Sequence, residues 1–350
     1  MANTNERVED LTDQADTQDS GPGTQHSDDR YKVFHNKGRW QGLPLRVEDT
    51  GEAPHFEPLN PRIPRPTPRV PFPDILAFGV PNHGMMAGQP TNVYLMGYVA
   101  DEGRSLALVD TGDKSSEDVL LAALAQTGVA IERITQIILT HCHPDHVGNA
   151  AALKQATGAT VYAHPLERQQ IERFGNDLEV DVWVEPGQSI DCDGFTVETI
   201  FTPGHSPGHY CVVEPGSGVL LAGDMISGFG SVGIFPPHGS MRQYIDSLRR
   251  LLAAHEARPF SLVGPGHGPA IEDARAKIEE YITHRLAREE EVYDAVVSGA
   301  SSVDDILPIA YPDVQPHLSF AARSTLQAHL DKLIEDGRIR RVADDRYAVA

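Results

Sequence analysis

The stretch that decides the fold is IILTHCHPDHVG, residues 137–148. It opens with an apolar run typical of a buried strand and ends in a turn crowded with histidine. Loops that follow strands are where α/β proteins place reactive groups. The turn brings together three imidazoles and a carboxylate, which suit zinc or a related transition metal: His141, His143, Asp145 and His146. One metal ion could not use all four comfortably, so the pattern favours more than one.

Each of these histidines taken alone could be an ordinary loop residue, since most histidines bind no metal. Three later loops change that interpretation, because each follows a predicted strand and carries a His or Asp beside glycine. They are TPGH ending at His205, AGD ending at Asp224, and GPGHG around His267. Glycine permits close backbone approach to a buried site. Each loop alone would be an ordinary Gly/Pro turn, but in this order they predict further ligands.

The sequence around these loops alternates between strand and helix patterns. Strands are predicted at Ile75–Val80, Thr91–Val99, Ser105–Asp110, Ile134–Thr140, Thr160–His164, Phe195–Thr202, Tyr210–Glu214, Gly218–Gly223 and Ser261–Val263. Helices are predicted at Ser115–Gly128, Asn149–Gly158 and Met241–His255. This alternation predicts a layered α/β domain over residues 75–284.

Both ends of the chain differ from this domain in composition and in predicted secondary structure. Residues 1–30 are acidic and polar with almost no large apolar side chains, so we expect a disordered tail. Residues 31–74 contain prolines too closely spaced for a helix or a central strand, which predicts an extended segment. Residues 285–350 show a helix at Arg285–Ser298, a short helix near Ile306, a helix at Ser319–Asp336 and a basic hairpin. Three helices followed by a small β-wing predict a winged-helix module.

Composition limits the partners and the chemistry. The formal net charge of -21 disfavours binding to nucleic acid or to an anionic membrane. No run approaches the roughly 20 apolar residues that span a bilayer, and the start lacks the basic flank and apolar run of a signal peptide, so we expect a cytoplasmic protein without a membrane partner. The three cysteines show no Cys-x-x-Cys spacing. Metal binding must therefore come from histidines and carboxylates.

The His-x-His-x-Asp-His motif at 141–146, followed by His205, Asp224 and His267, resembles the metallo-β-lactamase superfamily, most closely its glyoxalase II-like branch. The resemblance implies a four-layer αββα sandwich that holds two divalent metal ions per chain. It implies that one ion is held by His141, His143 and His205, and the other by Asp145, His146 and His267, with Asp224 bridging. Asp110 matches a family aspartate that orients a ligand histidine. We expect zinc, with iron and manganese as alternatives.

Two divalent cations roughly 3.5 to 4 Å apart can share a water and lower its pKa towards neutrality. This chemistry predicts a hydrolase acting on a small-molecule ester, thioester or lactone. Asp145 would be a metal ligand first and at most a secondary proton acceptor. His238 lies in a Pro/Gly-flanked loop after Asp224 and is a candidate substrate contact, with plain surface exposure as the alternative. We expect Cys142 to pack away from the metals, and His164 and His209 to be structural.

The C-terminal region resembles the winged-helix tail of beta-lactamase-like hydrolases, some of which are endoribonucleases. A metal-dependent endoribonuclease or phosphodiesterase acting on RNA is therefore the rival hypothesis. The basic residues of the wing are few for nucleic acid binding: Arg338, Arg340, Arg341 and Arg346. The module could instead close the active-site cleft or form a homodimer contact.

Further functional classes fit the sequence less well. The oxygen-reducing diiron branch would have glutamate at position 143, where this chain has histidine. An iron sulfur dioxygenase shares much of the ligand set and stays open. A non-catalytic winged-helix regulator is disfavoured by the complete ligand set, and an antibiotic-destroying β-lactamase by the lack of an export signal.

Overall fold

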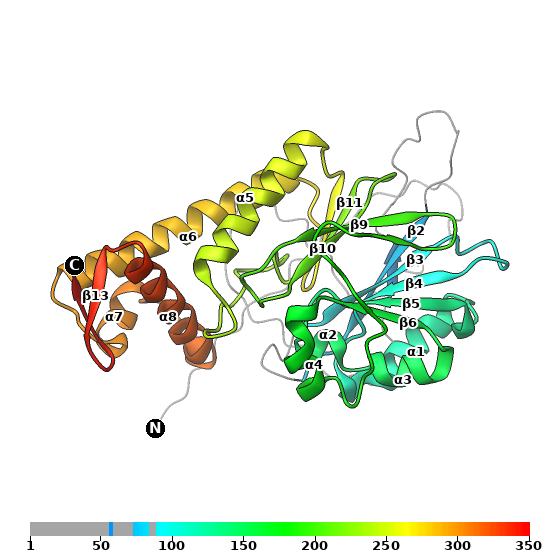
Figure 1. Ribbon diagram of the computed structural model, residues 1–350, viewed down its shortest axis with the longest axis horizontal. Helices are drawn as coiled ribbons and strands as arrows, with labels where there is room; N and C mark the ends of the chain where they lie inside the picture. The colour runs from blue at the N-terminus through cyan, green and yellow to red at the C-terminus, as the bar shows by residue number, and fades with distance from the viewer. Residues whose placement is uncertain (1–55, 59–72, 84–88) are drawn as a thin grey trace, which may run out of the picture. The chain divides into compact units, whose positions relative to one another are not determined.

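The computed structural model describes residues 56–58, 73–83 and 89–350, all within one compact unit. In these ranges a layered α/β domain is followed by a small helical domain (Figure 1). No helix of the described part is long and apolar enough to cross a membrane. The prediction of a disordered tail at residues 1–30, and most of the extended segment predicted at 31–74, lie outside the described residues.

In the described part of the chain the first sheet has seven strands, arranged in chain order. They are β1 (Phe56–Pro58), β2 (Asp74–Val80), β3 (Thr91–Gly97), β4 (Leu106–Val109), β5 (Ile134–Ile138), β6 (Thr160–Ala163) and β7 (Val182–Trp183). The pairs from β1 to β4 are antiparallel, and those from β4 to β7 are parallel. Parallel neighbours need crossover connections. These are supplied by α1 (Glu117–Gln126), α2 (Pro144–Val147), α3 (Ala150–Thr157) and α4 (Arg168–Phe174).

The second described sheet has the order β12-β11-β10-β9-β8. Its strands are β8 (Ser189–Asp191), β9 (Thr196–Phe201), β10 (Tyr210–Glu214), β11 (Val219–Gly223) and β12 (Leu262–Pro265). Only β11 and β12 pair in parallel within it, and the connection between them contains α5 (Met241–Ala257). α5 and the first part of α6 (Ala274–Val297) pack on the outer face of this sheet.

Alternating side chains of the strands divide the catalytic domain into layers. In β3, Val93 and Leu95 join the core beneath the helices α1 and α3, whereas Tyr94 and Met96 join the core between the two sheets. This is the two-residue period of a strand that is buried on both faces, and such strands have nearly continuous apolar sequences. A further core lies between the second sheet and α5. The predicted four-layer αββα sandwich is confirmed.

The winged-helix prediction is confirmed as well. Its elements are the second part of α6, α7 (Val303–Ala310), α8 (Ser319–Glu335), β13 (Ile339–Ala343) and β14 (Arg346–Val349). They share a core that includes Ile306 and Leu330. A capping box between Ser302 and Asp305 begins α7, as the Ser-Ser-Val-Asp-Asp sequence leads one to expect.

The predicted start of the first C-terminal helix was wrong. That helix begins at Ala274 instead of Arg285, with the Asp273 side chain accepting a hydrogen bond from the Ala276 backbone N–H. It therefore runs across the expected boundary at residue 284. Ile278 packs in the catalytic domain and Val292 in the C-terminal core, so one helix serves two cores. Its apolar face shifts between them, which breaks the periodicity that marks a single amphipathic helix.

Four short elements were not predicted from the sequence: α2, α4, β7 and β8. The strands β7 and β8 have two and three residues, too few to show alternation. α4 has one fully buried aliphatic side chain, Ile171, and apart from Phe174 at its end the other residues are polar. Short elements such as these are fixed by what they pack against.

Gly148, at the end of the histidine-rich motif, offers a test of this packing. A Cβ at Gly148 would lie 2.4 Å from the Lys114 backbone nitrogen and 2.7 Å from the Gly112 carbonyl oxygen. Because these are backbone atoms, Gly148→Ala should lower the free energy of unfolding by about 1–3 kcal/mol, measured by urea denaturation. Gly103→Ala is the control, since its Cβ would meet only the Asp101 carboxylate at 3.5 Å. Equal stability of the two variants would contradict this account.

Candidate metal centre

The first group of donors consists of three histidines from two loops. His141 and His143 follow β5, and His205 follows β9. His143 Nδ1 lies 3.0 Å from His141 Nε2 and 2.8 Å from His205 Nε2. The other ring nitrogen of His205, Nδ1, is 3.0 Å from the Gly233 carbonyl oxygen, to which it donates. His205 therefore turns the lone pair of Nε2 towards the other two rings, as a metal-ligating histidine does.

The second group contains His146, His267 and Asp145. His146 Nδ1 is 2.7 Å from Asp110 Oδ2, and His267 Nδ1 is 3.1 Å from the Pro90 carbonyl oxygen. Asp145 Oδ2 lies 3.4 Å from His267 Nε2 and 3.7 Å from His146 Nε2. Both Nε2 atoms are buried and have no hydrogen-bond partner among the described residues. Buried polar atoms without partners are rare in proteins and call for an explanation.

Asp224 lies between the two groups. Its Oδ2 is 3.4 Å from His205 Nε2, and its Oδ1 is 3.4 Å from both His146 Nε2 and His267 Nε2. Oδ1 is a third buried atom that lacks a hydrogen-bond partner in the described part of the structure. Within each group the candidate ligand atoms lie within 4.8 Å of one another. The cluster therefore fits a dinuclear metal site: the three unpartnered atoms converge on one another in the second group, and the ring nitrogens of the first group converge beside Asp224 Oδ2.

Burial and neighbouring charges set the protonation of the cluster. Burial, reinforced by the adjacent rings, lowers the pKa of His141 and His205 well below the usual value, so these imidazoles are neutral. Burial also lowers the pKa of His146, but the surrounding carboxylates outweigh it and leave the pKa well above the usual value. Burial raises the pKa of Asp224, but His267 and His146 outweigh it and hold the pKa well below the usual value. His141 and His205 are thus neutral beside the ionised Asp224 carboxylate, the forms that bind metal, whereas His146 must release its proton when a metal binds.

Asp110 holds His146 in place, at the position that the sequence analysis assigned to an orienting aspartate. It is buried and adopts a left-handed conformation with φ of 59°. Its Oδ1 accepts from the Thr140 backbone N–H at 2.8 Å, while Oδ2 faces His146. The carboxylate therefore joins the end of β4, the end of β5 and a histidine of the cluster.

Several supporting residues escaped the sequence analysis. The side chains of Asn82 and Thr91 donate to Asp145 Oδ2 at 2.7 and 2.9 Å. The buried Glu167 carboxylate accepts from the Ser206 hydroxyl at 2.6 Å, directly after His205. None of these residues belongs to a recognisable motif, so no local signal could have found them.

His238 is not brought into the cluster by the described contacts. It is exposed, and its Nε2 lies 2.8 Å from Gln170 Nε2. His209 is buried and accepts through Nε2 from the Asp224 backbone N–H at 3.2 Å, so it positions the Asp224 loop. His164 stacks on Phe201. These findings agree with structural roles for His164 and His209 and leave the proposed substrate contact of His238 a prediction.

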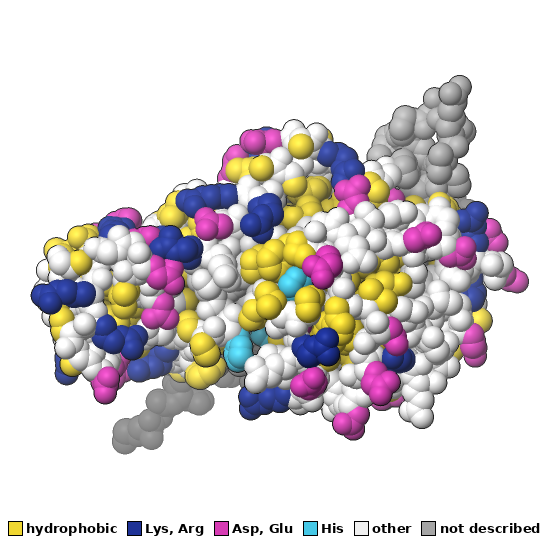
Figure 2. Space-filling view, viewed as in Figure 1, with side chains coloured by type: hydrophobic (Ala, Val, Ile, Leu, Met, Phe, Trp, Pro, Cys, Tyr) yellow, Lys and Arg dark blue, Asp and Glu magenta, His cyan; other side chains and the backbone are white. Residues whose placement is uncertain are grey.

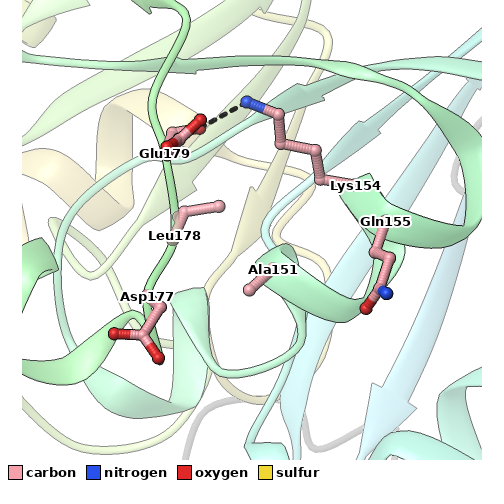
Figure 3. Close-up of a pocket in the computed structure, with 6 residues that line it drawn as sticks. All are labelled: Ala151, Lys154, Gln155, Asp177, Leu178 and Glu179. Carbon is pink, nitrogen blue, oxygen red and sulfur yellow. Dashed lines mark hydrogen bonds between the residues drawn. The ribbon is translucent and has the colours of Figure 1, made fainter.

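Cys142 is buried in the core beneath the helices, so its predicted position away from the metals is confirmed. A separate surface hollow beside α3 contains none of the cluster residues (Figure 3). Within it, Lys154 Nζ donates to the Glu179 carbonyl oxygen at 2.7 Å. Because its one ammonium group is already paired there, we assign this hollow no role in the site.

Comparisons with known proteins agree with this geometry. Residues 86–267 match the model of the Metallo-beta-lactamase superfamily, and residues 302–347 match the Beta-lactamase associated winged helix domain. The Beta-lactamase-like protein 2 homolog of Drosophila melanogaster is 31% identical over 288 residues, which cover 77% of this chain and 91% of that protein. The Atrochrysone carboxyl ACP thioesterase of Aspergillus fumigatus is 29% identical over 212 residues, 60% of this chain and 61% of that protein.

The fold is also found in solved structures. The metallo-beta-lactamase family protein TTHA1429 from Thermus thermophilus matches with a TM-score of 0.63 and 24% sequence identity, covering 79% of this chain and 98% of that one. An αββα sandwich with a buried His/Asp cluster at the strand ends defines a class of metallo-hydrolases. The chain belongs to the metallo-beta-lactamase superfamily and carries the associated winged-helix domain.

Replacing Asp110 tests the support of the second group. Asp110→Asn keeps the shape and tolerates the positive φ, but it removes the charged acceptor of the His146 Nδ1–H bond. Loss of such an outer partner should weaken metal affinity roughly 10- to 100-fold, measured by chelator competition. Asp118→Asn, on the exposed surface of α1, should leave the affinity unchanged. Unchanged affinity in both variants would refute the positioning role of Asp110.

Proposed function

We propose that the protein is a dinuclear metal-dependent hydrolase that acts on a small-molecule ester, thioester or lactone. The observation that carries the proposal is the buried Asp224 carboxylate, which directs one oxygen to each of two histidine-rich groups. The first metal would be held by His141, His143 and His205, and the second by Asp145, His146 and His267, with Asp224 between them. Zinc is the expected metal, with iron and manganese as alternatives.

When bound, two divalent cations lower the pKa of a shared water and stabilise negative charge on the attacked group. The protein's own residues supply the geometry. His146 is fixed by Asp110 and His205 by the Gly233 carbonyl, so each ring faces the centre in one tautomer. Asp145 Oδ2 already accepts two hydrogen bonds, from Asn82 and Thr91. These bonds hold the carboxylate in one orientation, as the outer partners of a metal ligand do.

A thioester substrate has support from the comparison with fungal relatives. The relative from Aspergillus fumigatus is named as a thioesterase, and its similarity covers 60% of this chain. Hydrolysis of a thioester, an ester or a lactone makes the same demand on the site, which is stabilisation of an oxyanion at a carbonyl carbon. We therefore place acyl substrates ahead of phosphodiesters.

The charges of the C-terminal domain also favour a small substrate over RNA. Arg338 pairs with Glu290 at 2.7 Å, Arg341 lies 3.7 Å from Asp331, and Arg346 lies 3.6 Å from Asp305. On the face shown in Figure 2, basic and acidic side chains are interspersed instead of gathered by sign. Three of the four arginines of the wing thus have an acidic neighbour, which reduces their attraction for phosphates. An endoribonuclease activity remains the rival that the assay must address.

The test combines metal analysis with turnover. Purified protein should contain about two metal ions per chain and hydrolyse members of a panel of lactones, esters and thioesters. Asp145→Ala removes a proposed ligand and should lower turnover by more than the roughly 10- to 100-fold expected for losing an outer partner. Asp246→Ala, at an exposed position on α5, is the matched control and should retain activity.

Single-stranded RNA belongs in the same panel. Cleavage of RNA without turnover of any acyl substrate would replace the proposed function with the rival. A purified protein that takes up no metal would refute both.

A further inference from the structure

The segment between Asp224 and α5 passes the first donor group and is held by helices of the C-terminal region. The Gly233 carbonyl oxygen accepts the hydrogen bond from His205 Nδ1 at 3.0 Å. On one side of Gly233, the Val232 carbonyl oxygen accepts a hydrogen bond from Arg285 Nη2 of α6. On the other side, the Ile234 backbone N–H donates to Thr325 Oγ1 of α8 at 3.1 Å. The residue that orients His205 is thus fixed from both sides.

These two bonds are shielded from water. Arg285 is 2% exposed and Thr325 is 5% exposed, and Ile234 is fully buried. Hydrogen bonds in such surroundings are stronger than at the surface, and leaving one partner unpaired there is costly. The Ile234 N–H therefore depends on the Thr325 hydroxyl.

Arg285 is an unusual residue to bury. It forms no ion pair among the described residues, and it lies 5.1 Å from the centre of the Tyr244 ring. A buried guanidinium without a carboxylate partner carries a desolvation penalty. Here the charged group donates to the Val232 backbone carbonyl, next to Gly233. We infer that Arg285 is buried in order to fix the backbone of this loop, since its burial alone would not stabilise the fold.

A third contact extends the same attachment. The ring of Phe235 stacks on Phe320 of α8, with 6.1 Å between ring centroids. Phe320 is itself 63% exposed, so this contact lies at the surface above the buried pair of bonds. Figure 1 shows α8 beside the loop that precedes α5. Residues 232, 234 and 235 thus all contact α6 or α8.

We propose that the winged-helix domain, through α8, and the helix α6 that leads into it position the metal centre. Thr325 and Arg285 fix the backbone on both sides of Gly233, and the Gly233 carbonyl then holds His205 with Nε2 facing His143. The inference rests on the proposed function in that His205 is taken as a metal ligand. It deepens that function by making the C-terminal domain part of the site.

The supports of the second donor group come from other elements. His146 is held by Asp110, and Asp145 by Asn82 and Thr91. The His267 ring is held by the Pro90 carbonyl, and all of these side-chain supports lie within the catalytic domain. Loss of the C-terminal contacts should therefore lower the affinity for the ion held by His141, His143 and His205. The affinity for the other ion should not change. This asymmetry separates a positioning role from a general loss of stability.

Thr325→Val in the full chain removes the hydroxyl acceptor and keeps the side-chain shape. We expect the affinity for one of the two metal ions, titrated as Zn²⁺ against a chelator, to fall roughly 10- to 100-fold while the other stays at the wild-type value. Thr325→Ser, which restores the hydroxyl, should recover the wild-type affinity. Phe320→Ala changes an exposed residue, so the fold should tolerate it. We expect this variant to lower the affinity for the same ion by a smaller factor.

Thr157→Val is the matched control. The Thr157 hydroxyl also accepts a backbone N–H bond, from Ala159 at 3.1 Å, but it lies at the end of α3. The control loses the same kind of bond and should keep both affinities. Wild-type affinities for both ions in Thr325→Val and Phe320→Ala, or an equal loss at both ions, would overturn the inference.

The experiment also separates this inference from the proposed function. A wild-type chain that binds two ions but hydrolyses none of the acyl substrates would overturn the proposed function, while the affinities of Thr325→Val would still decide the inference. A wild-type chain that binds no metal would overturn both.

Discussion

The arrangement of the histidines in the metal centre depends on one buried carboxylate, that of Asp224. Asp224 lies within 3.4 Å of ring nitrogens of His146, His205 and His267, and its Oδ1 has no hydrogen-bond partner among the described residues. A buried negative charge is tolerated only where cations or strong donors compensate it. The histidines around Asp224 must therefore be held closely, and much of the surrounding hydrogen bonding does so.

The two sheets meet at this charge. Strand β3 of the first sheet is hydrogen-bonded to the His267 loop of the second sheet. The Asn92 backbone N–H donates to the Gly266 carbonyl at 2.8 Å. The Tyr94 hydroxyl donates to the Pro265 carbonyl at 2.6 Å. His209 in turn holds the Asp224 backbone. The hydrogen bonds that position the metal centre thus also join the two sheets of the sandwich.

The C-terminal domain shares one continuous helix, α6, with the catalytic domain. α6 packs Tyr281 in the catalytic core and Val292 in the winged-helix core. The Tyr281 hydroxyl donates to the Gly230 carbonyl at 2.9 Å, four residues before Ile234 meets α8. One helix that spans both domains thus also holds the loop that follows Asp224.

The α/β alternation, the family and the candidate ligand set can be predicted from the sequence, because local patterns encode them. Apolar runs mark strands, and the ligands of the motif lie within six residues of one another, from His141 to His146. Only the tertiary structure decided which residues support the ligands. The hydrogen-bonded residues Asn82 and Asp145 are 63 positions apart in the sequence, and Ile234 and Thr325 are 91 positions apart. A local sequence pattern therefore cannot predict either contact. The start of α6 and the exposed position of His238 have the same cause, since both depend on packing partners that are distant in sequence.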